Sequence, residues 1–108
     1  MASLDEFIDA LEGLRQKWHQ QRYSFPGFDR MIAERGHVDA VNAVVRATAI
    51  PRGYERLWKN GRLDLTVEAL VADGRFDGVL GRNVTDAARS RLQQFQYPLP
   101  PLPPRRPA

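Results

Sequence analysis

Four carboxylates in the second half of the chain have a spacing that could support acid/base chemistry. Asp64 precedes Glu68 by four residues, and Asp73 precedes Asp77 by the same interval. Residues four apart share a helix face, so each pair could place two acids in one cleft, as general acid/base catalysis needs. Both pairs also coincide with predicted turns and helix starts, where acids cap backbone amides. We therefore expect structural roles for these acids and predict no catalytic residue.

Metal and nucleophile chemistry finds little support in the sequence. His19 and His37 lack a nearby His or carboxylate at metal-ligand spacing, apart from Asp39 two residues after His37. There is no Cys, which rules out thiolate zinc sites, cysteine nucleophiles and disulfides within the chain and fits a reducing compartment. We expect no metal, no cofactor and no enzymatic activity, and a cytoplasmic location.

Prolines concentrate in residues 98–108, which hold six of the eight in the chain. Proline lacks an amide donor and fixes φ, so this basic tail cannot continue a helix and is expected to form an extended polyproline II arm. The run from Pro100 to Arg105, PPLPPR, has the P-x-x-P-x-basic spacing that SH3-type grooves bind. Pro100, Pro103, Arg105 and Arg106 are therefore candidate partner-binding residues, although a solubilising extension or a spacer would have the same composition.

Large aromatic side chains are numerous for a chain of 108 residues, with five Phe, three Tyr and two Trp. Most of them should lie in the core. Tyr23 and Phe25 directly precede the turn pair Pro26-Gly27. If this aromatic loop lies outside the core, its rings offer a protein partner a large contact area.

A nucleic-acid alternative rests on a predicted helical hairpin around the Asn60-Gly61 turn, which has the layout of a helix-turn-helix. Its second helix has no Lys or Arg after Arg62 to meet bases and phosphates, and an ordinary hairpin explains the same residues. Arg105 and Arg106 supply two of the three net positive charges, which leaves the rest of the chain near +1. The candidate nucleic-acid contacts are Arg52, Arg56, Lys59, Arg62, Arg82, Arg89 and Arg91.

Hydrophobic periodicity predicts a series of helices, separated by turns and loops, within residues 3–97. Apolar residues three and four apart indicate a first helix over about residues 4–21, with Ser3 and Glu6 forming a capping box at its start. Pro26 and Gly36 bound a short second helix. A third helix is expected from His37, and a fourth over about residues 52–59.

The second half of the chain is harder to assign. Residues 63–71 fit either an alternating strand or a helix, and we predict a helix, capped by Asp64 or Thr66, because no partner strand is evident. Residues 73–81 are predicted to be a loop. The last helix is expected over about residues 85–96, with its apolar residues buried and with Arg89 and Arg91 near the opposite side.

These observations predict an all-α fold: a single irregular bundle of five or six short helices in residues 1–97, followed by the proline-rich extended tail 98–108. No run of about 18 apolar residues and no signal-peptide pattern occurs, so we expect no membrane partner. The function predicted is a small adaptor or regulator that binds a protein partner through an aromatic patch, the tail or both, as a monomer or a homodimer. The alternative is a small DNA- or RNA-binding accessory protein.

Overall fold

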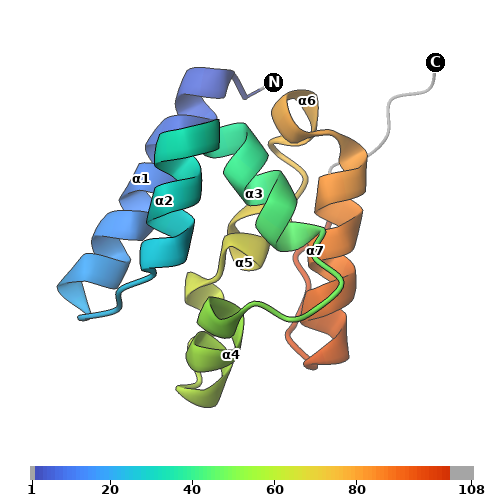
Figure 1. Cartoon of the computed structure of the whole chain (residues 1–108). Helices are drawn as coiled ribbons and strands as arrows, with labels where there is room; N and C mark the ends of the chain where they lie inside the picture. Colours follow the sequence, from blue (N-terminus) through green and yellow to red (C-terminus); the bar gives the residue numbers. More distant parts are fainter. Residues whose placement is uncertain (1, 103–108) are drawn as a thin grey trace.

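The computed structural model describes residues 2–102, and its regular structure is entirely helical (Figure 1). No helix in this part of the chain is long and apolar enough to cross a membrane. The described residues form seven α-helices and one short 3-10 helix, η1, more than the five or six helices predicted. Their bounds are α1 Leu4–Gln20, α2 Pro26–Arg35, α3 His37–Val45, α4 Arg52–Lys59, η1 Leu63–Leu65, α5 Val67–Val71, α6 Asp77–Leu80 and α7 Arg82–Gln94.

The first helix begins as its sequence predicts. The Glu6 amide donates to Ser3 Oγ at 3.2 Å, and the Ser3 amide donates to the Glu6 carboxylate at 3.4 Å, which completes the capping box. The apolar stripe buries four side chains along the helix: Phe7, Leu11, Leu14 and Trp18. This face anchors α1 to η1 and α5.

The second and third helices form a hairpin around Gly36. This residue has φ +89°, a conformation that favours glycine, and it ends α2 and begins α3. Its amide donates to the Ile32 carbonyl at 2.8 Å, and its carbonyl accepts from the Ala40 amide at 3.1 Å. The predicted glycine cap is confirmed, and α2 packs along α3 (Figure 1).

The ambiguous segment 63–71 is helical, but in two pieces. Thr66 lies between η1 and α5, with extended backbone. Its buried hydroxyl donates to the Leu63 carbonyl at 2.7 Å and accepts from the Ala69 amide at 3.0 Å. One side chain thus closes η1 and caps α5, so the predicted Thr66 cap is confirmed and the Asp64 alternative is not used.

The segment 73–81 contains a helix that the sequence interpretation assigned to a loop. Residues 77–80 form α6, and α7 starts at Arg82 rather than near Thr85. Thr85 is buried and donates to the Asp77 carboxylate, which also accepts from Arg82 at 3.1 Å. The prediction assigned Asp77 to a turn or helix start, whereas its carboxylate connects α6 to α7 through Thr85 and Arg82.

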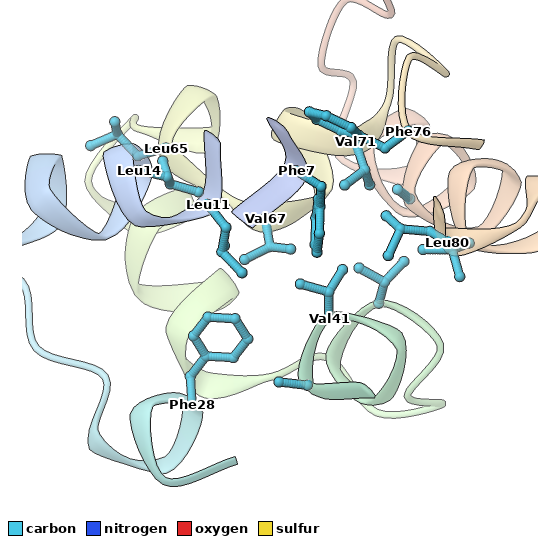
Figure 2. Packing of buried hydrophobic residues seen from close by; sticks show 14 of the residues in the cluster. Phe7, Leu11, Leu14, Phe28, Val41, Leu65, Val67, Val71, Phe76 and Leu80 are labelled. Carbon is cyan, nitrogen blue, oxygen red and sulfur yellow. The ribbon is translucent and has the colours of Figure 1, made fainter. Parts of the chain in front are cut away.

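The main core lies where α1, α3 and α5 meet. Figure 2 shows Phe7 between Val41 of α3 and Val71 of α5, with Leu11 beside Val67. Phe7 also meets Phe76 edge to face at 5.3 Å between ring centroids. The core thus takes residues from most of the helices, and α4 lies at the opposite end of the molecule from the N-terminus (Figure 1).

A smaller apolar cluster joins α4 to α7 and to the start of the tail. Its buried members are Tyr54, Leu63, Ala72 and Leu92. Phe95, Tyr97 and Leu99 pack on its edge. Residues 98–102 have no regular secondary structure, and the Pro100 carbonyl accepts a hydrogen bond from Arg89 Nη1 at 2.6 Å. The start of the tail therefore lies against the helical body.

Candidate apolar pocket between helices α2 and α4

A pocket with a volume of about 530 Å³ opens between the start of α2 and α4, with the start of α5 among its lining residues. Its apolar walls include Phe25, Phe28, Met31, Leu57 and Val67. A concave, mostly apolar space of this size is typical of a binding site.

The loop before α2 is held in place by aromatic packing. Trp18 meets Phe25 edge to face at 4.8 Å between ring centroids, and its Nε1 donates to the Leu65 carbonyl at 2.7 Å. A Cβ built on Gly53 would lie 3.0 Å from Phe25 Cδ1, so the ring packs directly on the backbone of α4. Only glycine leaves room for this close approach, which joins two walls of the pocket.

A buried ion pair borders the pocket. Glu68 is only 1% exposed, and its carboxylate accepts from Arg91 Nη1 at 2.8 Å. The same guanidinium donates to the carbonyls of Val44, at 2.9 Å, and Ala47. Arg91 therefore ties α5 and α7 to the end of α3 and to the segment that leads into α4.

Burial also sets the ionisation of the groups around this ion pair. Loss of solvent raises the pKa of the Glu68 carboxyl above its ordinary value, against the opposing hydrogen bond from Arg91. Burial likewise raises the pKa of the Tyr54 phenol, and the nearby Glu68 carboxylate adds to the effect. The Arg91 guanidinium lies 5.8 Å from the centroid of the Tyr54 ring. Glu68 thus stabilises the fold through its buried ion pair with Arg91.

Two arginines of α4, Arg52 and Arg56, stand among the residues that line the pocket, and both are exposed. The Arg56 guanidinium lies over the Tyr23 ring, 5.3 Å from its centroid. A shallow depression next to the pocket shares both arginines and is completed by Glu55, Lys59 and Asn60. We call these five residues the basic shelf.

The predicted aromatic loop contributes directly to this site. Tyr23 and Phe25 are half-buried and stack with 6.1 Å between ring centroids. Phe25 lines the pocket, while Tyr23 supports Arg56 beside it. The two rings are therefore packed against the body and help to form a cavity, instead of projecting from a loop.

The predicted basic residues are not gathered into one surface. Arg91 was expected near the exposed side of its helix but is buried and paired with Glu68, because its guanidinium replaces water with three acceptors and an aromatic face. Arg62 pairs with Asp64, and Arg82 with Asp77 and Asp86. Arg89 donates to the carbonyls of Ala72 and Pro100. Arg52, Arg56 and Lys59 remain together on α4.

The predicted carboxylate pairs are also separated by their surroundings. Asp64 is exposed and pairs with Arg62, whereas Glu68 is buried. Asp73 accepts from the Arg75 amide, while Asp77 binds Thr85 and Arg82. Within residues 2–102 no three His, Cys, Asp or Glu side chains gather where they could hold a metal ion.

In the tail, Pro100 is half-buried and held by Arg89, whereas Pro103, Arg105 and Arg106 lie outside the described residues.

Sequence reasoning missed the pocket walls formed by Phe28, Met31 and Leu57, which periodicity assigns to the core. One signal was available: Glu68 interrupts an otherwise apolar face in residues 63–71, which indicates a buried acid in need of a cation.

Comparison of this chain with protein-family models, with curated proteins and with solved structures found no match.

Proposed function

We propose that this chain is a non-enzymatic interaction module that binds a protein partner through the apolar pocket between α2 and α4. The observation that carries the proposal is the pocket itself, about 530 Å³ with aromatic and aliphatic walls open to the surface. A few side chains buried in such pockets, aromatic ones above all, supply most of the energy of protein interfaces.

The chemistry of the pocket favours binding over catalysis. Glu68 is the one acid among the described residues that line the pocket, but it is buried and its carboxylate is hydrogen-bonded to Arg91, so it is not free to act as a general base. The Thr66 hydroxyl, also among the lining residues, already donates to the Leu63 carbonyl. The polar groups near the pocket thus maintain the fold.

The proline-rich tail is the second proposed contact with a protein partner. Pro100 begins the P-x-x-P-x-basic run but is held by Arg89, and Leu99 packs on the smaller apolar cluster. A groove that binds Pro100 therefore has to compete with the body of the protein for it.

Nucleic-acid binding is the weaker alternative because most of the candidate arginines already have partners. Arg91 is buried, and Arg62, Arg82 and Arg89 bond to acceptors of the chain. The basic shelf leaves three cations for phosphates, of which Lys59 pairs with Glu55 at 2.8 Å. This supports at most weak, salt-sensitive binding.

Two exposed glycines provide a matched test of the pocket. Gly27 lines the pocket and Gly13 lies on α1 away from it, and a Cβ added at either meets nothing within 4 Å. Gly27→Trp should fill the pocket, while Gly13→Trp adds the same ring elsewhere. The measurement is affinity capture from a lysate of the protein's own cells, with and without nuclease, using the wild type, both variants and a chain ending at Tyr97.

The proposal expects a protein that the wild type and Gly13→Trp capture after nuclease treatment and that Gly27→Trp loses. A partner list that is the same for both glycine variants contradicts the pocket. Partners lost after nuclease treatment would favour the nucleic-acid alternative. Loss of a partner only from the chain ending at Tyr97 would place the contact in the tail.

A further inference from the structure

We infer that the pocket takes a bulky apolar side chain from a partner segment whose neighbouring residues are acidic, and that Arg52 and Arg56 bind those acidic residues. The inference rests on the proposed function, because it names the chemistry of the partner that the pocket would bind.

The interior of the pocket favours an apolar anchor. The Glu68 carboxylate is taken by Arg91 at 2.8 Å, and the Thr66 hydroxyl has both a donor and an acceptor within the chain. A small polar ligand would find no convergent set of unoccupied groups to orient it there, as small-molecule sites provide. A ring or branched aliphatic side chain, in contrast, needs only the contact surface that Phe25, Phe28 and Met31 offer.

The charge at the mouth specifies what should flank that anchor. Arg52 and Arg56 are one helical turn apart on α4, both are exposed, and neither forms an ion pair with another described residue. Tyr23 supports Arg56 from beneath, which keeps its guanidinium beside the pocket. Two such cations at one rim attract carboxylates and repel basic segments.

The basic shelf extends this charge beyond the rim. It holds three cations and one acid, and Glu55 is engaged by Lys59. Because the shelf and the pocket share Arg52 and Arg56, a segment anchored in the pocket would continue over a positively charged surface. The tail of the chain itself, with Arg105 and Arg106, carries the same charge as this surface and is a poor occupant.

The test is selection of a random peptide library displayed on phage against the immobilised full chain. Peptides that also bind Gly27→Trp are removed, and the most enriched one is synthesised and titrated by fluorescence anisotropy. Ser24→Trp, at a second exposed position lining the pocket, replaces Gly27→Trp if that variant does not fold by circular dichroism.

Charge reversal at Arg52 and Arg56 separates the inference from the proposed function. Arg52→Glu with Arg56→Glu should weaken the selected peptide by about tenfold or more, because attraction becomes repulsion. Arg35→Glu with Arg46→Glu is the matched control, with the same change in net charge at two exposed positions that do not line the pocket. A new selection on the reversed variant should enrich Lys and Arg beside the anchor.

Enrichment of Phe, Trp, Leu or Ile with Asp or Glu nearby, lost in the pocket-filling variant, supports the inference. Pocket-dependent peptides without acidic residues, equally bound by both charge variants, overturn the inference but leave the proposed function standing. Both the inference and the pocket proposal fail if no peptide distinguishes the wild type from the pocket-filling variants. They also fail if the pocket binds dodecanoate, used as an apolar small-molecule probe, but binds no peptide.

Discussion

The Arg91 guanidinium contacts residues from several distant parts of the chain. Its guanidinium neutralises Glu68 and supplies donors to the carbonyls of Val44 and Ala47, all in an environment where it is 8% exposed. A buried ion pair gains little over an apolar replacement, but losing one partner leaves an uncompensated charge. The arrangement thus explains why an arginine is needed on the inner side of α7.

Replacing Arg91 alone should therefore be costly. Arg91→Met leaves the Glu68 carboxylate and two carbonyls without their donor, and we expect a loss of about 3–5 kcal/mol in the free energy of unfolding. Urea denaturation measures it, with Arg46→Met, an exposed arginine, as the control. Glu68→Gln with Arg91→Met should be more stable than Arg91→Met alone, and strict additivity of the two changes would contradict their coupling.

The same site predicts a pH dependence. In Arg91→Met the pKa of Glu68 rises further, because burial is no longer opposed by the guanidinium. Between the ordinary carboxyl pKa of 4.5 and the raised pKa of the folded state, the folded protein binds more protons than the unfolded chain. The free energy of unfolding therefore falls as the pH rises between these two values. Urea midpoints at about pH 5 and about pH 8 should differ more for this variant than for Glu68→Gln with Arg91→Met. Parallel profiles would argue against an ionised, buried Glu68.

At the scale of elements, Thr66 connects η1 to α5. Thr66→Ala removes the donor to the Leu63 carbonyl and the cap of the Ala69 amide, and should cost about 1–2 kcal/mol of stability. Thr66→Ser keeps the hydroxyl and should recover most of that loss. Denaturant unfolding of the two variants makes the comparison, and equal losses would assign the effect to packing of the methyl group instead.

The contact between α7 and the start of the tail makes a separate prediction. Arg89→Ala removes the hydrogen bond to the Pro100 carbonyl, so the backbone amides of Leu99 and Leu102 should gain fast motion. Heteronuclear NOE values report this, with Ser90→Ala on the exposed face of the same helix as the control. An SH3-type domain that binds Pro100 should then bind Arg89→Ala more tightly, and unchanged NOE values would show that Leu99 packing alone holds the segment.

For the whole molecule, the structure predicts how much of the C-terminal region the helical body requires. Ending the chain at Tyr97 loses the half-buried Leu99 and one hydrogen bond, which should cost only about 1–2 kcal/mol. Ending it at Gln94 also removes Phe95 and Tyr97, whose rings cover Tyr54 and its cluster, and should cost clearly more. Thermal unfolding compares the two chains, and equal melting temperatures would contradict the packing of the smaller cluster.

Local patterns in the sequence determined most of the helices. The capping box of Ser3 and Glu6, the glycine turn at Gly36 and the limits of α4 each depend on residues within a few positions of one another. Short-range hydrogen bonds and fixed backbone preferences make such features readable without tertiary information. α6 was missed because it lacks such local signals: its four residues are stabilised by Thr85 and Arg82 of the next helix.

The candidate site was decided by the tertiary structure. Arg91 and Glu68 are 23 residues apart, and Phe25 and Gly53 meet only because α4 is carried back beside the start of α2. Periodicity shows that Phe28, Met31 and Leu57 face inward, but it cannot show whether the space before them is filled or left open. A pocket depends on how whole helices are spaced, and that spacing results from long-range packing that no local pattern encodes.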